Sequence, residues 1–292
     1  MKPNKFIQTI EIDWNKIPEH SYLRNISVLR NLKHLEFNSN ITFFAGENGS
    51  GKSTLLEAIA VAYGFNPEGG TKNYSFETYH DVSELSEAIY ISKGFKKPES
   101  GYFFRAESFF NVATKAEEYD AFNPNGPSYG GRSLHCQSHG ESFLSFFQTF
   151  QKQGIYILDE PEAALSPQRQ LTLFMQIAQK AKEGSQFLIA SHSPILLGLP
   201  EAEILSFDGN TIEKISYEDT ESYARSKGIG KALLDYAKTL KSHLYLHVYE
   251  KNNRAVCFYK RENFRLEREG IDENTGEKEY CMEWKREYEK SI

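Results

Sequence analysis

The chain has few cysteines and no long apolar run, and both absences exclude classes of protein. Its 292 residues include three widely spaced cysteines, which suits neither a disulfide framework nor a cysteine-rich zinc site. No segment approaches the roughly 18 consecutive apolar residues of a membrane span, and the first residues lack the apolar stretch of a secretory signal. The sequence therefore predicts a cytoplasmic protein that does not insert into a membrane.

An excess of positive charge is also missing. The chain holds 34 Lys and Arg against 40 Asp and Glu, a formal net charge of −6, which argues against general attraction to nucleic acid. Residues 223–292 nevertheless carry 15 basic and 12 acidic side chains, which leaves 19 basic and 28 acidic side chains for residues 1–222. This change of sign predicts a domain junction near Tyr223, with domains at 1–222 and 223–292.

Apolar strands alternate with helical patterns along the first domain, which predicts an α/β fold with a mostly parallel sheet. Ser166 and Pro167 are typical of a helix start. Asp208 and Gly209 lie between two short apolar runs and predict a hairpin. Residues 82–94, "VSELSEAIYISKG", are interpreted as a short helical piece, and residues 137–154 as a longer helix.

A glycine-rich loop, "GENGSGKST", follows the apolar run at 41–45 and opens a helical pattern that ends at Gly64. Its glycines let backbone N–H groups curl around a phosphate, while Lys52 neutralises phosphate oxygens and Ser53 offers a hydroxyl to Mg²⁺. A glycine turn that merely connects strand and helix is the alternative. The residues predicted to bind ATP here are Gly46, Glu47, Asn48, Gly49, Ser50, Gly51, Lys52, Ser53 and Thr54.

Three further polar side chains follow buried strands. Asp159 and Glu160 end the run "IYIL", and His192 follows "QFLIAS", so all three are expected at the carboxyl edge of the sheet. We expect Asp159, with Ser53, to hold Mg²⁺ and its water, and Glu160 to act as the general base. His192 would approach the γ-phosphate. An acidic strand end and a structural histidine are the alternatives.

Taken in order, these motifs resemble the ATP-binding-cassette (ABC) ATPases, especially the soluble branch related to chromosome-maintenance and DNA-repair ATPases. "GENGSGKST" resembles the Walker A motif, "IYILDEPE" the Walker B motif, "SHS" the switch histidine and "AALSP" the D-loop. The resemblance spans about residues 20–222. It implies a P-loop NTPase fold with a small helical subdomain, in which Lys52, Glu160 and His192 are catalytic.

The same resemblance implies an ATP-dependent homodimer, in which two protomers sandwich two ATP molecules and Mg²⁺. "SHGES" resembles a variant of the family's signature motif, so Ser138, Gly140 and Glu141 would cap the ATP of the other protomer. Glu141 replaces the family's glutamine, and Ser166 replaces an aspartate of the D-loop. Glu107 is the candidate for the Q-loop position.

A second glycine turn, R-x-x-G-x-G, opens an amphipathic helix and presents N–H groups to an anion. With "NNRAVCFYK" downstream, it resembles the C-terminal half of the GCN5-related N-acetyltransferases over about residues 224–285. The resemblance implies acetyl-CoA contacts and an α/β fragment that is half of that fold. The residues it implicates are Arg225, Gly228, Gly230, Asn252 and Tyr259.

The first half of the acetyltransferase fold, including the strand that lines the pantetheine arm, should precede Arg225. The motifs of the ATPase stand there instead, so we expect no efficient acetyl transfer. Three alternatives to a hydrolysing ATPase remain open. They are an acetyltransferase with a regulatory ATPase domain, the nucleotide-binding subunit of a transporter, and a module that binds ATP without hydrolysing it. DNA, RNA, a toxin partner or another protein would each be compatible as the partner of the ATP cycle.

Overall fold

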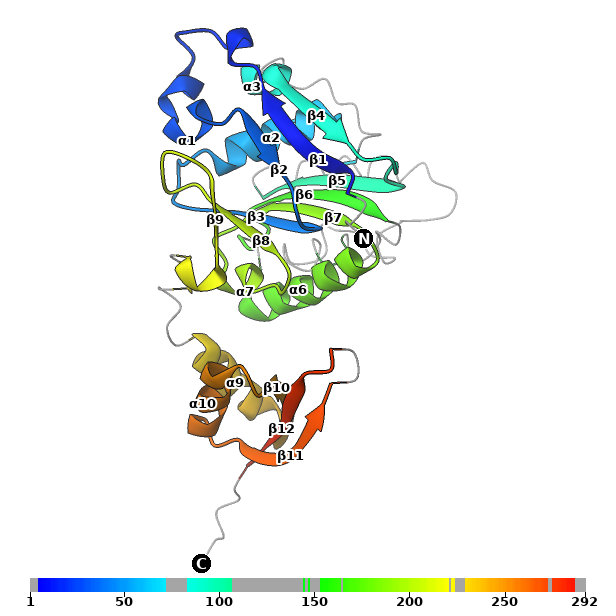
Figure 1. Ribbon diagram of the computed structural model, residues 1–292, viewed down its shortest axis with the longest axis vertical. Helices are drawn as coiled ribbons and strands as arrows, with labels where there is room; N and C mark the ends of the chain where they lie inside the picture. The colour runs from blue at the N-terminus through cyan, green and yellow to red at the C-terminus, as the bar shows by residue number, and fades with distance from the viewer. Residues whose placement is uncertain are drawn as a thin grey trace, which may run out of the picture. The chain divides into compact units, whose positions relative to one another are not determined.

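The computed structural model describes residues 5–71, 83–106, 144, 147, 153–163, 165–220, 222–223, 229–272 and 275–286. The chain separates into two compact units, Met1–Ala224 and Arg225–Ile292 (Figure 1). Each unit is described by itself below. Within the described ranges, no helix combines the length and the apolar character that crossing a lipid bilayer requires.

The first unit is built on a six-stranded sheet with the strand order β5-β6-β7-β3-β8-β9. The five strands from β5 to β8 run parallel, and β9 pairs with β8 in the antiparallel direction. The prediction of an α/β fold with a mostly parallel sheet is confirmed, as is the hairpin at Asp208 and Gly209. The strands are β3 (Ile41–Ala45), β5 (Ser100–Arg105), β6 (Gly154–Asp159), β7 (Gln186–Ala190), β8 (Glu203–Ser206) and β9 (Glu213–Ile215).

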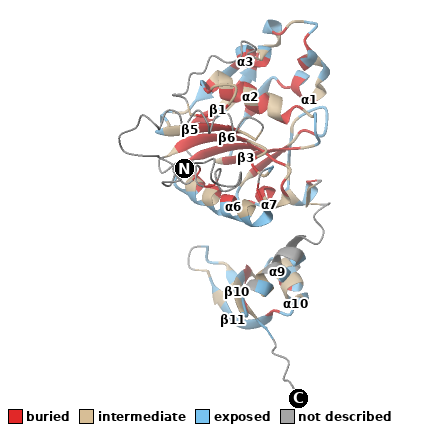
Figure 2. Ribbon diagram, turned by 180° about the vertical axis from the view of Figure 1, so that it is seen from behind, coloured by how far each residue is buried: buried red, intermediate tan, exposed pale blue. Residues whose placement is uncertain are grey.

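Helices cover both faces of this sheet, which explains why β3 and β7 are buried along their whole length (Figure 2). Alternate residues of a strand point to opposite faces. Phe44 accordingly packs in the cluster that contains α2 (Lys52–Tyr63), whereas Phe43 packs in the cluster that contains α6 (Pro167–Lys182). The short α7 (Pro194–Leu197) belongs to the second cluster.

Helix α6 begins where the sequence predicts. The hydroxyl of Ser166 accepts a hydrogen bond from the backbone N–H of Arg169 at 3.4 Å, and Pro167 occupies the first turn. The predicted helix at residues 137–154 lies mostly outside the described residues. Leu144 and Phe147 are described; both are helical and buried.

A second, antiparallel sheet with the order β2-β1-β4 packs on the α2 side of the first unit. Here the interpretation of residues 82–94 as helical is wrong after Ala88. The chain turns there into a strand because Ile89 and Ile91 alternate with polar residues and pair with β1. The elements are β1 (Ile7–Ile12), β2 (His34–Glu36), β4 (Ile89–Lys93), α1 (Ser27–Arg30), α3 (Glu84–Ala88) and the 3₁₀ turns Trp14–Lys16 and Tyr22–Asn25.

The second unit is smaller, with an antiparallel sheet of order β10-β12-β11 and two helices. Its buried apolar core consists of Val248, Val256, Phe264 and Met282. The elements are α9 (Ile229–Leu240), β10 (His243–Tyr249), α10 (Asn253–Arg261), β11 (Arg265–Ile271) and β12 (Lys278–Lys285).

Candidate nucleotide-binding site

The loop between β3 and α2 has the backbone that its glycines predict. Gly46, Gly49 and Gly51 have φ angles of 142°, 81° and 98°, a region that side chains with a Cβ rarely adopt. Space is short as well, because a Cβ on Gly51 would lie 2.9 Å from Ile26 Cγ2. Both conformation and packing therefore require glycine in this loop.

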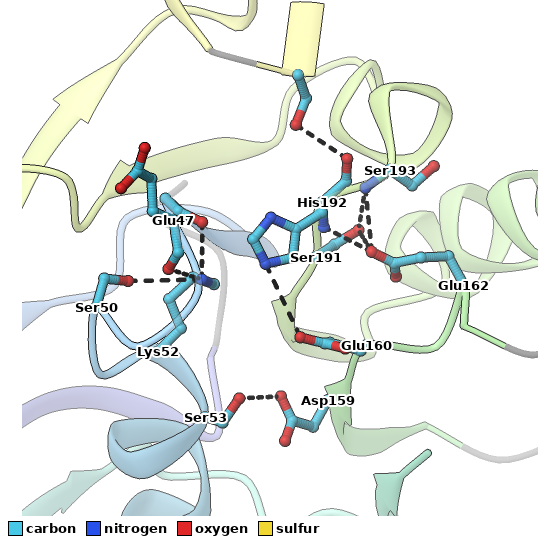
Figure 3. A network of polar contacts seen from close by, with 12 residues as sticks. Glu47, Ser50, Lys52, Ser53, Asp159, Glu160, Glu162, Ser191, His192 and Ser193 are labelled. Atoms are coloured by element: carbon cyan, nitrogen blue, oxygen red, sulfur yellow. Dashed lines mark hydrogen bonds and ion pairs between the residues drawn. The ribbon is translucent and has the colours of Figure 1, made fainter. Parts of the chain in front are cut away.

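Lys52, the first residue of α2, folds back over the loop (Figure 3). Its ammonium donates to the carbonyl oxygens of Gly46 and Glu47, each at 2.7 Å. Burial lowers the pKa of Lys52, while the nearby carboxylates, Glu160 first among them, raise it. A buried cation at the centre of a loop of N–H groups is an arrangement suited to a phosphate chain.

Ser53 and Asp159 meet at the carboxyl edge of the sheet, although 106 residues separate them in the sequence. The Ser53 hydroxyl donates to Asp159 Oδ1 at 2.8 Å (Figure 3). Neighbouring oxygen ligands of an octahedral Mg²⁺ lie about 2.9 Å apart, because each Mg–O bond is about 2.0–2.1 Å long. The two oxygens thus have the spacing and the chemistry of adjacent Mg²⁺ ligands.

Glu160 follows in an unusual conformation, with a φ of 48°. Its N–H donates to the carbonyl of Ala190, the last residue of β7, at 3.0 Å. His192 lies two residues beyond, and its Nε2 is 3.8 Å from Glu160 Oε1. A non-glycine residue in the left-handed region is typical of functional sites, and here it directs the carboxylate toward the imidazole (Figure 3).

Two carboxylates that the sequence did not predict as site residues also belong to this edge. Asp208 Oδ1 accepts a hydrogen bond from the N–H of Glu47 at 2.7 Å. Glu162 Oε1 accepts from the hydroxyl of Ser191 at 2.8 Å and from the N–H of His192 at 2.6 Å. The repeated Glu in "DEPE" was a signal for Glu162, whereas Asp208 was explained by its hairpin alone.

An open cavity of about 620 Å³ lies directly beside the loop. Residues 25–28, residues 47–50 and Phe207, Asp208 and Gly209 line it. Phe207 is the only aromatic side chain in this lining and is itself buried against Phe44. The cavity has room for a nucleoside next to the phosphates, without a stacking ring exposed among these lining residues.

The remaining predicted site residues fall in three groups. Glu107, Ser138, Gly140, Glu141, Arg225 and Gly228 lie outside the described residues. Gly230 lies in the first turn of α9. Asn252 caps α10 by accepting from the N–H of Ala255 at 3.1 Å, and Tyr259 packs on Phe264 with ring centres 5.5 Å apart.

A family model described as an AAA domain matches residues 22–291, which is most of the chain and runs through both units. The chain belongs to this AAA domain family. The family match, the strand order and the phosphate loop together make it an ABC-type P-loop ATPase, that is, an ATP-binding NTPase domain. Membership of this family is general evidence for ATP hydrolysis.

Curated relatives resemble parts of the chain. The ribose import ATP-binding protein RbsA of Bacillus cereus is 23% identical over 216 residues, which cover 66% of this chain and 43% of that protein. The peptidyl-lysine N-acetyltransferase YiaC of Escherichia coli is 36% identical over 58 residues, which cover 20% of this chain and 40% of that protein. The chain thus spans less than half the length of either relative.

Solved structures of similar type include an ATP-binding cassette of an ABC transporter in its ADP conformation. It is 17% identical, with coverage of 80% of this chain and 98% of that chain and a TM-score of 0.42. The SMC head domain from Thermotoga maritima is 12% identical, with coverage of 72% and 98% and a TM-score of 0.38. The assignment to an ABC-type ATPase depends on the family match and the site, not on these scores.

Proposed function

We propose that the chain is a Mg²⁺-dependent ATPase of the cytoplasm whose ATP cycle drives the formation of a homodimer. The observation that carries the proposal is the contact of Ser53 Oγ with Asp159 Oδ1 at 2.8 Å, with Lys52 and Glu160 beside it. A hydroxyl, a carboxylate, a cation and a base are the groups that phosphoryl transfer to water requires.

Each residue has a separate role in this proposal. The N–H groups of the loop and the ammonium of Lys52 bind the phosphates, while Ser53 and Asp159 hold Mg²⁺, which neutralises charge on the β- and γ-phosphates when bound. Glu160 accepts a proton from the attacking water while the oxygen of that water bonds to the γ-phosphorus. The bond between the γ-phosphorus and the β-phosphate oxygen breaks at the same time, and ADP leaves. His192, within reach of Glu160, orients the γ-phosphate.

Dimerisation is supported by the resemblance of "SHGES" to a signature motif that acts on the partner's ATP. Ser138, Gly140 and Glu141 would close the site in trans. A dimer with two ATP molecules at its interface is then the state that hydrolyses.

The Glu160→Gln variant tests both parts. It keeps the shape of the side chain but removes the base, so ATP turnover should fall by about 10²- to 10⁴-fold and the ATP-bound dimer should persist in sedimentation. Glu213→Gln, on exposed β9, is the matched control and should behave like the wild type. A Glu160→Gln protein that stays monomeric with ATP and binds no ATP in calorimetry would refute the proposal.

The partner of the ATP cycle is proposed to be a nucleic acid or another protein. ATP turnover with and without DNA separates these, since stimulation by DNA supports a repair-like role. The likeness to a ribose import protein supports a transporter subunit as the alternative, and co-purification with a membrane protein would favour it.

For residues 223–292 we propose a partial acetyltransferase fold that binds acetyl-CoA poorly and transfers no acetyl group efficiently. The likeness to a peptidyl-lysine N-acetyltransferase over 58 residues supports the fold. Among the described residues its sheet has only three strands, in the order β10-β12-β11, which supports its incompleteness. The boundary near Tyr223 belongs to the same proposal.

A further inference from the structure

One side chain holds the loop that carries His192 but takes no part in the chemistry proposed above. The switch loop, defined as Ser191, His192 and Ser193, surrounds a single oxygen of Glu162. That oxygen, Oε1, accepts from Ser191 Oγ at 2.8 Å, from His192 N at 2.6 Å and from Ser193 N at 3.1 Å (Figure 3). Three donors from consecutive residues thus converge on one carboxylate oxygen.

Glu162 and the general base lie in the same turn. The N–H of Ala163 donates to the carbonyl of Glu160 at 3.1 Å, and the N–H of Leu165 donates to the carbonyl of Glu162 at 2.9 Å. The backbone of Glu160 is itself bonded to Ala190, next to the switch loop. Two sets of hydrogen bonds therefore join the turn after β6 to the loop after β7. One is the bond from Glu160 N to Ala190 O, before His192, and the other is formed by Glu162, after Glu160.

A second bridge joins the same two segments. Ser193 Oγ donates to Gln170 Oε1 at 2.6 Å, and Gln170 Nε2 donates to the carbonyl of Leu165 at 3.1 Å. Gln170 lies on α6, so the helix fixes one end of the switch loop while Glu162 fixes its centre. This leaves the imidazole of His192 as the part of the loop directed at Glu160.

Burial of the Glu162 carboxylate is unfavourable for the stability of the folded chain. Glu162 Oε2 is buried and has no hydrogen-bond partner among the described residues, and burial raises the pKa of Glu162. A buried carboxylate with one oxygen unsatisfied is unfavourable unless its other contacts offset the loss of hydration. Every hydrogen bond described between the Glu162 side chain and another residue comes from the switch loop, so its role lies there.

We propose that Glu162 is a positioning residue that sets the distance and direction of the His192 imidazole relative to Glu160 by holding the N–H groups of His192 and Ser193. The inference rests on the proposed ATPase function for its kinetic consequence only. Loss of the carboxylate frees the loop, and His192 no longer meets the γ-phosphate in the geometry for hydrolysis.

The test compares Glu162→Ala and Glu162→Gln with Glu203→Ala in the full chain. Glu203 is a matched control because it is also a buried carboxylate that accepts from a backbone N–H, that of Asn38 at 3.0 Å, but it begins β8 away from the loop. Two measurements are made on each: the steady-state kcat and KM for MgATP, and the hydrogen-exchange rates of the His192 and Ser193 amides by NMR.

For Glu162→Ala we expect kcat to fall by about 10²-fold, since a misplaced catalytic group costs that much, with KM nearly unchanged. Exchange of the His192 and Ser193 amides should accelerate. Glu162→Gln should recover much of kcat because its amide oxygen still accepts the three donors. Glu203→Ala should change stability but neither kcat per folded molecule nor exchange in the switch loop.

Two results would overturn the inference: a kcat for Glu162→Ala like that of Glu203→Ala, or switch-loop amides that exchange no faster in Glu162→Ala than in Glu203→Ala. If the wild type hydrolyses no ATP, the proposed function fails and the amide exchange alone decides. Faster exchange would then support the positioning role of Glu162, and unchanged exchange would overturn it.

Discussion

Each unit has a glycine motif in its sequence just before or at the start of a helix, α2 or α9, but the described residues of the two units are buried to very different extents. The first unit covers both faces of its sheet, and its strands β3 and β7 are buried throughout. In the second unit, the buried apolar cluster of the described residues has four members, and six of the seven residues of β11 are exposed. Figure 2 shows the same contrast between the two units.

The difference teaches what an anion-binding loop needs beyond glycine. In the first unit, the loop is fixed by Lys52, by Asp208 and by packing on Ile26. Such contacts direct the N–H groups before any ligand arrives, so that binding does not have to order them. A small core supplies less of this rigidity, because a short chain buries a smaller fraction of its surface.

The largest expected effect comes from removing a core ring in each unit. Phe187→Ala should lower the free energy of unfolding of the first unit by about 3–5 kcal/mol, because Phe187 is fully buried and its ring stacks on that of Tyr156 with centres 5.0 Å apart. Phe264→Ala should unfold the second unit and leave ATP turnover intact. Thermal unfolding, followed with ATP binding, checks this. If the protein unfolds in a single thermal transition and both variants lower its midpoint temperature, the two units do not have independent cores.

A smaller effect is expected from substituting glycine at the loop. Gly51→Ala and Gly64→Ala each force alanine into a positive φ, 98° or 105°, at a strain of roughly 1–3 kcal/mol. A Cβ at Gly64 meets nothing within 4 Å, unlike one at Gly51. Calorimetry should show a loss of ATP affinity for Gly51→Ala but not for Gly64→Ala. If the two variants bind ATP with equal affinity, the geometry of this loop does not determine phosphate binding.

A smaller effect again is expected from truncation. A chain that ends at Ala224 should hydrolyse ATP like the full protein, because Ser222 Oγ still donates to the carbonyl of His192 at 2.9 Å and Tyr223 still contacts Tyr217. A chain that ends at Thr220 should show a lower kcat with little change in KM. If the first truncation fails to fold, the second unit is required for the core of the first.

The smallest effect is expected at the second loop. Gly228→Glu places a negative side chain where the resemblance puts a pyrophosphate, yet we expect little change, because little acetyl-CoA binds in the first place. Calorimetry with acetyl-CoA and a peptide acetylation assay measure this. Acetyl transfer by the wild type that Gly228→Glu abolishes would show a working acetyltransferase.

Local signals in the sequence were sufficient for the loop and for most elements. Gly46 and Gly51 are required by the backbone itself, and Ser166 and Pro167 start α6 through contacts within one turn. The strand at residues 89–93 was interpreted as helical, because a short alternating run becomes a strand only when β1 is there to pair with it. Pairing partners distant in the chain leave little local trace.

By itself, the sequence determined the phosphate loop, the two carboxylates after β6 and the alternation that makes the sheet parallel, because each depends on neighbours along the chain. Only the tertiary structure decided that Asp208 would hold the loop and that Glu162 would hold His192. Both contacts join strand ends that are separated in sequence by 161 and 30 residues. Sheet order brings such ends to one edge, and hydrogen bonds at that edge follow from strand order rather than from any local pattern.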